Sequence, residues 1–386
     1  MKILSVTGTV FPQPSNNTNL LLSVLCALPQ SEEIRLLAPE PHKGLEQSFI
    51  RRFPIRFTQA GQGNRLRERL TLLRAKLTDR SGFSDAIHVD RILRATDELY
   101  REDPFDAVIC ISEPFSSAAA GINIKCRGKR LVYIMDPPEI VRGDRGTAYR
   151  NRMLGKMLCG YDAILTTPFI RQALSEHGYS RYDSRIIEVG FPMIRQQAFI
   201  PTSDCGDGRI HLLFCGWLYS NIRSPKYFLD ILSRLDERFV VTFMGKECEK
   251  LTERFSVQTN AELITLPQQP YETALQAMAE ADILINIGNS VPVHMPSKTL
   301  EYINTGKPFV NFHKMDDCPT LYYTKRYPLC LNMSERDPDL DAAAERFAAF
   351  CLQNSGRTVD RVFIEEEYAE CTPDYIAKTI LDALKP

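Results

Sequence analysis

The chain of 386 residues lacks most of the features that would place it in a specialised class of protein. No run of 18 apolar residues occurs, and Met1 leads directly into a strand-like segment rather than into a signal peptide. The formal charge is only −1 at pH 7, so the overall balance gives no reason to expect a nucleic-acid partner. These absences together predict a cytoplasmic protein.

The eleven cysteines show no pairing pattern. Their number is odd, and no two of them have the C-x-x-C spacing of a zinc or redox site. Cys110, Cys215 and Cys330 fall within apolar, strand-like runs, where a thiol behaves as a small apolar side chain. We therefore expect reduced thiols, and neither a disulfide framework nor a metal site.

Apolar residues make up 44% of the chain and charged residues 25%, as in ordinary globular proteins. Short apolar runs alternate with helical stretches, and this alternation is typical of parallel, doubly wound α/β sheets. The predicted strands of the first half are 2–8, 33–39, 53–58, 107–112, 131–136, 163–167 and 185–190. Those of the second half are 211–216, 240–245, 261–267, 281–288 and 308–312.

The length and the repeated pattern indicate two domains. A stretch with prolines, glycines and polar residues but no clear period separates the two halves of the chain. We therefore predict Rossmann-like domains at 1–190 and 209–371, joined by a linker at 191–208. The remaining segment, 372–386, begins with a Thr-Pro pair and has the apolar spacing of a helix that packs onto another domain.

The second half contains one stretch with strong local signals, HMPSKTLEYINTGKPFVNF at 294–312. Pro296 and Ser297 predict the start of a short helix, with the Ser297 hydroxyl available to cap its first turn. Gly306 predicts its end, because a left-handed residue is needed there. The apolar run 308–312 then predicts a buried strand.

The N-terminus of such a helix, placed after the strand 281–288, suits a phosphate or another anion. Lys298 adds a full positive charge on the first turn. Glu301 lies four residues after Ser297, on the same face, where a carboxylate can accept hydrogen bonds from sugar hydroxyls. An anion together with a polyol indicates a nucleotide sugar. The alternative is a crossover helix that binds no ligand, as many α/β proteins have.

Other loops of the second half are expected on the same side of its sheet. Gly216 permits close approach of the backbone, and Arg223 is placed before a helix start, where it can face a diphosphate. An exposed loop arginine is the alternative. Gly288, Asn289 and His294 follow the strand 281–288 and are candidate contacts of the donor sugar.

Two loops of the first half are candidate substrate loops, because ligands of doubly wound sheets bind beyond the carboxyl ends of the strands. The loop after the first strand contains Gly8, Asn16 and Asn17 and lacks a G-x-G-x-x-G dinucleotide fingerprint. Asp136 and Glu139 flank two prolines at another strand end. Asp136 is the candidate catalytic acid that positions an acceptor hydroxyl or acts as a base. The alternative is that the prolines end the strand and both acids are solvated.

The segment 64–80 is a predicted basic helix with a net charge of +4, from six basic and two acidic residues. Its leucines recur with 4-3-4 spacing and make one apolar stripe: Leu66, Leu70, Leu73 and Leu77. The usual meaning is a helix that packs through its leucines and solvates its basic face. The alternative is peripheral contact with an anionic membrane surface, such as the inner face of the membrane, that presents a lipid-linked acceptor.

Several of these stretches, namely ADILINIGNS, PSKTLEY, INTGKPFV, FCGWLYSNIRSP and YIMDPPE, resemble segments of GT-B glycosyltransferases. The pattern P-S-K-x-x-E-Y-x-x-x-G-K-P resembles the donor segment of bacterial family 4-type enzymes, which are retaining and metal-independent. The resemblance implies two Rossmann-like domains that face a central cleft, with the acceptor side at 1–190 and the donor side at 209–371. It also implies that the C-terminal helix packs back across the domains.

The same resemblance implies a function. A hexosyltransferase of this type would move a sugar from a UDP- or GDP-linked donor to a carbohydrate or lipid-linked acceptor, in synthesis of a bacterial surface polysaccharide or glycoconjugate. Neither a cofactor nor a metal is implied, and the nucleotide sugar is a co-substrate. Glu301 would bind the ribose, and Ser297, Lys298 and Arg223 would lie at the diphosphate.

Three positions depart from the family pattern. Val293 stands where a second, sugar-facing glutamate is often found, and Trp217 stands where an arginine is common. Met135 and Asp136 stand where many members have a histidine near the reacting carbon. A non-catalytic, nucleotide-sugar-binding partner in a polysaccharide assembly complex is therefore an alternative function. A hydrolysing epimerase is a further alternative, but it would want acid and base residues for which the sequence offers no compelling set.

Overall fold

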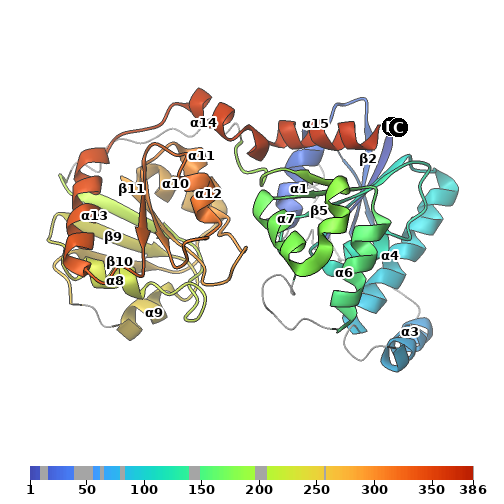
Figure 1. Ribbon diagram of the computed structural model, residues 1–386, viewed down its shortest axis with the longest axis horizontal. Coiled ribbons are helices and arrows are strands. Elements are labelled where there is room, and N and C mark those ends of the chain that lie inside the picture. The colour runs from blue at the N-terminus through green and yellow to red at the C-terminus, as the bar shows by residue number, and fades with distance from the viewer. Residues whose placement is uncertain are drawn as a thin grey trace. The chain divides into compact units, whose positions relative to one another are not determined.

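The computed structural model describes residues 1–8, 16–38, 55–60, 65–78, 83–138, 148–195, 207–255 and 258–385. The chain divides into two compact units, an N-terminal unit of 1–193 with 370–386 and a C-terminal unit of 194–369. Each unit contains a parallel sheet with helices around it, of seven and six strands among the described residues (Figure 1). The prediction of two Rossmann-like α/β domains is confirmed.

The N-terminal sheet has the strand order β3-β2-β1-β4-β5-β6-β7. Its strands are β1 (Lys2–Val6), β2 (Glu33–Ala38), β3 (Arg56–Gln59), β4 (Ala107–Ile111), β5 (Arg130–Ile134), β6 (Ala163–Thr166) and β7 (Ile186–Glu188). Its α-helices are α1 (Asn16–Cys26), α3 (Arg65–Thr78), α4 (Phe83–Glu102), α5 (Phe115–Gly121), α6 (Ala148–Gly160), α7 (Pro168–Leu174) and α15 (Pro373–Leu384).

The C-terminal sheet has the strand order β10-β9-β8-β11-β12-β13. Its strands are β8 (Ile210–Cys215), β9 (Phe239–Met244), β10 (Glu262–Leu266), β11 (Ile283–Ile287), β12 (Phe309–His313) and β13 (Cys330–Ser334). Its α-helices are α8 (Lys226–Leu232), α9 (Cys248–Phe255), α10 (Tyr271–Glu280), α11 (Lys298–Thr305), α12 (Thr320–Thr324), α13 (Leu340–Asn354) and α14 (Arg361–Glu367).

The chain's last helix completes the core of the N-terminal unit. Helix α15 begins where the sequence predicts, because the Thr372 side chain accepts a hydrogen bond from the amide of Tyr375 and a proline opens the first turn. Ile376, Ile380 and Leu384 are buried in one cluster with the apolar residues of α1 and of the sheet. The helix therefore fastens the end of the chain to the unit in which the chain begins.

The core of the C-terminal unit is built around phenylalanine rings. Phe228 of α8 lies 5.2 to 5.7 Å, between ring centroids, from Phe243 of β9, Phe312 of β12 and Phe347 of α13. All four side chains are almost completely buried. Burial of rings of this size supplies much of the hydrophobic free energy that holds α8 and α13 to the sheet.

A ladder of three asparagines crosses the interior of the same unit. Asn286, Asn311 and Asn332 occupy paired positions on β11, β12 and β13. Asn286 donates to the Asn311 side-chain oxygen at 2.7 Å, and Asn311 donates to Asn332 at 2.8 Å and to the Thr320 hydroxyl at 3.1 Å. A buried amide is costly only when it lacks partners, and here the neighbouring strands supply them.

Both sheets reverse their strand order at one point, between β1 and β4 and between β8 and β11. In doubly wound sheets the loops that follow two such strands diverge and leave the usual binding crevice. In the N-terminal unit, Gly8 after β1 packs so closely on Pro114 after β4 that an added Cβ would lie 2.3 Å from the proline Cδ. The strand order thus directs attention to the loops after β8 and β11.

Candidate functional site

Helix α11 starts at the carboxyl edge of the C-terminal sheet, after the loop that follows β11 (Figure 1). It ends at Gly306, which has the left-handed backbone angles φ 76° and ψ −3°, as the sequence predicts. The predicted cap at its start is wrong. Ser297 has helical angles, φ −59° and ψ −29°, and its side chain makes no cap hydrogen bond. A capping side chain needs an extended backbone at that position, which Ser297 does not have.

Lys298 and Glu301 form an ion pair on the first turn of α11. The Lys298 Nζ and the Glu301 Oε2 lie 2.5 Å apart, and the two side chains are only 21% and 11% exposed. Burial lowers the pKa of the Lys298 ammonium, but the Glu301 carboxylate and the Cys215 thiol outweigh it, so the pKa is raised overall. The ammonium is therefore protonated throughout the neutral pH range and its charge is balanced by one carboxylate.

Tyr302 ties this helix to the end of β8. Its side chain is fully buried, and its hydroxyl accepts a hydrogen bond from the Cys215 amide at 3.0 Å and donates to the Cys215 carbonyl at 3.3 Å. The Cys215 thiol lies in the field of the ion pair, since burial raises its pKa, Lys298 lowers it and Glu301 raises it. The first turn of α11 is thus held beside the loop that follows β8.

Arg223 joins the loops after β8 and β11. Its Nε donates to the Asn289 side-chain oxygen at 3.0 Å, and another guanidinium nitrogen donates to the Trp217 carbonyl at 3.1 Å. Burial lowers the pKa of Arg223, while the hydroxyl groups of Tyr219 and Tyr302 act to raise it. A guanidinium nevertheless remains protonated in proteins. Arg223 is therefore a half-buried cation held by two loops rather than the solvated loop arginine that was the alternative.

Further contacts join the same two loops. The Ser290 amide donates to the Ile222 carbonyl at 2.8 Å, and the Ser290 hydroxyl donates to the Asn221 carbonyl at 2.9 Å. The Asn289 side chain also donates to the His294 carbonyl at 2.8 Å, so it bridges Arg223 and the approach to α11. Asn289 and the His294 main chain thus hold Arg223 in place, and the His294 side chain is half-buried.

The glycines of these loops act through close backbone packing. An added Cβ on Gly216 would meet only ordinary contacts, the nearest at 3.4 Å. The demanding position is Gly245 after β9, where φ is +142° and an added Cβ would lie 1.8 Å from the Gly216 carbonyl oxygen. Gly288 packs on β12, since its Cβ would lie 2.8 Å from the Phe312 carbonyl oxygen. Gly245 is a residue that the sequence analysis missed.

Arg195 is a second residue that the sequence analysis missed. Its main chain is held by the Asn304 side chain at 3.0 Å and by Arg361 at 2.7 Å. Burial lowers the pKa of the Arg195 guanidinium, while Tyr271 and Glu301 act to raise it, so Arg195 lies in the field of Glu301. No motif surrounds Arg195, and its position in a predicted linker offered no signal.

Two of the three departures from the family pattern, Trp217 and Val293, have defined surroundings. Trp217 is exposed, and its ring stacks on Tyr219 at 4.6 Å between centroids, with the Lys246 ammonium 4.5 Å from the ring centre. Such an ammonium is attracted by the negative face of the ring. Val293 has φ +63°, which is unfavourable for a β-branched residue. The positive charge near position 217 thus comes from the Lys246 side chain, which lies on the Trp217 ring, and not from residue 217 itself.

The candidates in the N-terminal unit lie at the carboxyl edge of its own sheet. The Asn17 amide donates to the Asp136 carboxylate at 2.7 Å, which brings α1 and the end of β5 together. Gly8 packs on Pro114 at the switch point. The Asn16 side chain, the segment 9–15 and Glu139 lie outside the described residues. Of the N-terminal candidates, Asn17 and Asp136 are therefore the two whose side chains the structure brings together.

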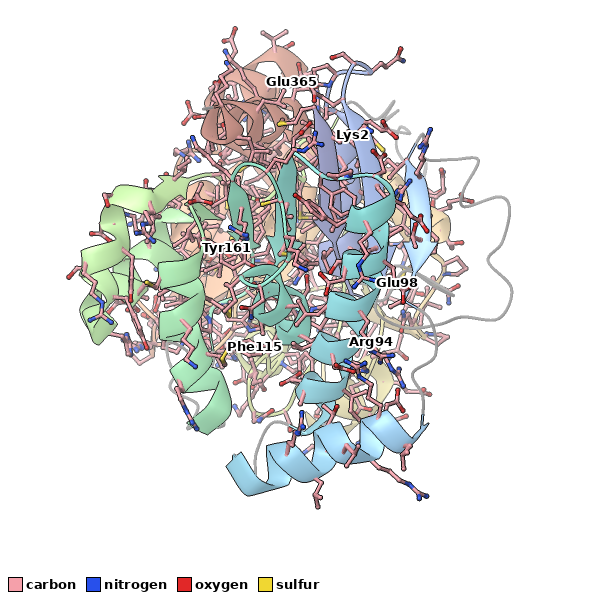
Figure 2. All side chains as sticks on the ribbon, turned by 90° about the vertical axis from the view of Figure 1, so that its right-hand side faces the viewer. Lys2, Arg94, Glu98, Phe115, Tyr161 and Glu365 are labelled. Carbon is pink, nitrogen blue, oxygen red and sulfur yellow. The ribbon has the colours of Figure 1, made fainter. Side chains whose placement is uncertain are left out.

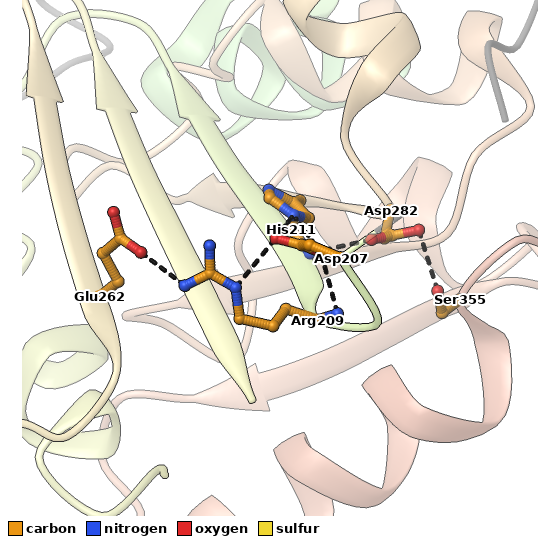
Figure 3. Close-up of polar contacts among 6 residues, drawn as sticks. All are labelled: Asp207, Arg209, His211, Glu262, Asp282 and Ser355. Carbon is orange, nitrogen blue, oxygen red and sulfur yellow. Dashed lines mark hydrogen bonds and ion pairs between the residues drawn. The ribbon is translucent and has the colours of Figure 1, made fainter. Parts of the chain in front are cut away.

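The opposite, amino edge of the C-terminal sheet carries a different charged group (Figure 3). The Arg209 guanidinium pairs with Asp207 at 2.9 Å and with Glu262 at 2.5 Å, and the His211 ring contacts Asp207 at 3.2 Å. The Arg209 amide, the His211 ring and the Arg209 guanidinium hold the pKa of Asp207 well below its usual range. These side chains join strand ends, and they lie across the sheet from α11.

Acidic residues elsewhere are also engaged in structural contacts. The D-x-D-x-D run before and within α13 could present carboxylates to a metal ion. Asp339 instead caps α13 by accepting from the Ala342 amide at 3.0 Å, and Asp337 pairs with Arg346 at 2.6 Å. In the described part of the chain, no group of three or more His, Cys, Asp or Glu residues is arranged to hold a metal ion. In the same part, no helix is both long and apolar enough to span a membrane.

No protein-family model matches the sequence, and no curated protein matches it. Solved structures do match over nearly the whole chain. The lipopolysaccharide outer core galactosyltransferase WaaB is 14% identical, with a TM-score of 0.64 and 99% of each chain covered. HepE of Anabaena, solved with UDP and glucose, is 11% identical, with a TM-score of 0.65 and all of each chain covered. Sucrose-phosphate synthase of Thermosynechococcus elongatus is 12% identical, with a TM-score of 0.65, and 99% of this chain and 97% of that chain are covered. The chain therefore has the GT-B fold that these proteins share.

Proposed function

We propose that this protein is a glycosyltransferase that moves a sugar from a nucleoside-diphosphate sugar to a hydroxyl group, with retained configuration. The observation that carries the proposal is the buried Lys298–Glu301 pair on the first turn of α11, beside Arg223 at the strand-order switch of the second sheet. Structures with the same fold include a galactosyltransferase and a protein solved with UDP and glucose, which supports a nucleotide sugar as the donor.

In this proposal, the donor changes the partners of the ion pair. The diphosphate lies against Lys298, Arg223 and the amide end of α11, and Glu301 turns to the ribose hydroxyls. When the bond between the sugar carbon and the diphosphate oxygen breaks, negative charge grows on the leaving diphosphate. Groups already aimed at that position stabilise the transition state more than the ground state. Because these positive charges come from the protein itself, the proposal needs no metal ion.

The acceptor is assigned to the N-terminal unit. Asp136, oriented by the Asn17 amide, positions the acceptor hydroxyl or receives its proton as the new bond to the sugar carbon forms. Gly8 belongs to the same loop region, and Gly288, Asn289 and His294 form the donor-sugar side. We propose a UDP- or GDP-linked hexose as donor and a surface polysaccharide or glycoconjugate precursor as acceptor. We propose that the reaction takes place in the cytoplasm.

The chain's only tryptophan supplies a direct test. The Trp217 carbonyl accepts a hydrogen bond from Arg223, and the indole stacks on Tyr219 in the same loop, so we expect its fluorescence to report a nucleotide that binds at Arg223. We expect one of UDP, GDP, dTDP and ADP to change Trp217 emission and to raise the unfolding temperature by mass action. The corresponding nucleoside, which lacks the diphosphate, is the control. If none of these nucleoside diphosphates binds, the proposal is wrong.

Transfer is tested with the donor sugars of the base that binds. We expect release of the nucleoside diphosphate in the presence of acceptor, and a product whose anomeric configuration, measured by NMR, equals that of the donor. An inverted product would contradict the retaining mechanism while leaving the transferase assignment intact.

A second candidate is a non-catalytic nucleotide-sugar-binding partner in a polysaccharide assembly complex. Trp217 and Val293, which stand where the family pattern has charged side chains, favour it. Tight binding of a nucleoside diphosphate, abolished by Glu301→Ala, together with no turnover of any donor sugar, would establish this second function.

A further inference from the structure

Helix α3 is attached to the N-terminal unit by its polar side. Glu68 pairs with Arg91 of α4 at 2.6 Å, with both side chains mostly buried, and Arg67 reaches Asp90 of α4 at 3.5 Å. Figure 2 shows α3 crossing the end of α4 at the margin of the unit. The ion pairs with α4 therefore turn Glu68 inward, and Leu66, Leu70 and Leu73 lie on the other side of the helix.

The leucine stripe of α3 faces solvent. Leu66 is 68% exposed, Leu70 is 52% exposed and Leu73 is 55% exposed. The expectation that the helix packs through these leucines is wrong for all three, because α4 supplies charged partners to the opposite side. The Leu77 side chain lies outside the described residues. Three large apolar side chains, one turn apart on one face, form an apolar patch of the kind that marks an interaction surface.

The charge of α3 indicates what covers this patch. The helix carries five basic residues and one acidic residue, Glu68, which is paired internally. Arg67, Arg69 and Arg74 are exposed beside the leucines. A second copy of the helix would bring two strongly positive faces together, and a nucleic acid would leave the leucines in water. An anionic lipid surface satisfies both features, since its headgroups attract arginines and its acyl boundary accepts leucines.

The position of α3 agrees with this partner. Strand β3 ends at Gln59 just before α3, and α4 runs from Phe83 back toward the start of β4. Because α3 contacts α4 at Asp90 and Arg91, in the N-terminal half of α4, it lies at the carboxyl edge of the sheet. The Asn17–Asp136 contact lies at the same edge.

We propose that α3 docks the N-terminal unit onto an anionic lipid membrane, with Leu66, Leu70 and Leu73 inserted at the headgroup boundary and the arginines among the headgroups. The carboxyl edge that carries Asp136 then faces the membrane. This docking goes beyond the proposed glycosyl transfer and does not depend on it, because binding to lipid is measured without a donor or an acceptor.

The test is sedimentation of the full-length protein with vesicles. We expect binding to phosphatidylcholine vesicles that contain phosphatidylglycerol, and weak binding to vesicles of phosphatidylcholine alone. Leu66→Gln with Leu70→Gln and Leu73→Gln should weaken binding at least tenfold. Arg69→Gln with Arg74→Gln should weaken it by about fivefold for each arginine at low salt.

Matched controls carry the same chemical changes elsewhere. Leu352→Gln replaces an exposed leucine of the C-terminal unit, and Lys325→Gln with Lys378→Gln removes two exposed charges. Both controls should bind vesicles as the unchanged protein does, and circular dichroism should show that all variants are folded. The proposal is overturned if the protein ignores anionic vesicles, or if the leucine variant binds them normally. It is also overturned if the leucine changes abolish a dimer in sedimentation equilibrium while vesicle binding persists.

Discussion

The two edges of the C-terminal sheet both carry charged side chains, but they use them differently. At the amino edge, Arg209 is shared by Asp207 and Glu262 in exposed pairs that link the start of β8 to the start of β10 (Figure 3). At the carboxyl edge, Lys298 has one carboxylate partner, Glu301, and both are mostly buried. Exposed pairs are screened and contribute little free energy, whereas buried charges are costly unless they are well paired.

The charged group at the amino edge therefore supports the fold, whereas the one at the carboxyl edge is suited to a ligand. At the amino edge, the charged side chains are paired with one another and remain exposed to water. The carboxyl edge holds the cations Lys298 and Arg195 near one carboxylate, Glu301, and the Arg223 guanidinium is hydrogen-bonded between the loops after β8 and β11. An arriving diphosphate would supply negative charge where positive groups are in excess.

The largest effect on nucleotide binding is expected from loss of the Arg223 guanidinium. Arg223→Gln should weaken binding of the nucleoside diphosphate by about 10- to 150-fold, because a hydrogen bond to a charged group contributes about 1.5–3 kcal/mol. Arg209→Gln, the same change at the amino edge, should leave binding unchanged. Trp217 fluorescence titration measures both. Equal losses in the two variants would show that the edges do not differ in function.

A smaller effect is expected at the ribose. Glu301→Gln should weaken binding about tenfold, since a neutral amide accepts hydrogen bonds from the ribose hydroxyls less strongly than a carboxylate does. The variant should also distinguish the ribonucleotide from its 2′,3′-dideoxy analogue less well than the unchanged protein. Titration calorimetry with both nucleotides checks this. An unchanged ratio of the two dissociation constants would remove Glu301 from the ribose.

Acid should affect the amino edge in a defined direction. The pKa of Asp207 is held below its unfolded value of about 4. Its contribution to stability is therefore complete above that value and is lost as the pH falls through the lower, folded pKa. Asp207→Asn should lower the unfolding temperature at pH 6, and the difference from the unchanged protein should shrink toward pH 3. Nucleotide binding at pH 7 should not change. A difference that is constant with pH would contradict this assignment.

The smallest effect is expected at the start of α11. Ser297→Ala should change the free energy of unfolding by only a few tenths of a kcal/mol, because the Ser297 side chain makes no cap hydrogen bond. Asp339→Ala should cost about 1 kcal/mol, since Asp339 does cap α13. Urea denaturation measures both. If Ser297→Ala weakens nucleotide binding while stability is unchanged, the Ser297 hydroxyl serves the ligand rather than the helix.

The fold was accessible from the sequence because its signals are local. Apolar runs with strand lengths, a glycine at the end of α11 and a Thr-Pro helix start each act within a few residues. The strand β13 was indicated only by Cys330 in an apolar run. The strands of a parallel sheet are easy to predict, because both of their faces are buried and they appear in the sequence as continuous apolar runs.

The site was only partly accessible, because it depends on contacts between distant segments. Lys298, Glu301 and Arg223 were found through a helix start and a loop. The main chain of Arg195 is held by Asn304 and Arg361, which are far away in sequence, and no periodic pattern in the sequence predicts those contacts. The Ser297 error has a related cause, because the loop before α11 already turns helically at that residue.

The asparagine ladder has a consequence for how this unit tolerates substitution. Asn311→Leu alone would leave the buried Asn286 amide without its partner, at a cost of about 1–3 kcal/mol, whereas the half-buried Asn332 oxygen would keep the Thr324 hydroxyl at 2.6 Å. Replacement of all three asparagines by apolar residues would in turn remove the hydrogen bonds that they make with the buried Thr320 and Thr324 hydroxyls. The three asparagines and the two threonines of α12 therefore form one hydrogen-bonded network across three strands and a helix, and a substitution at any one position changes the partners of the others.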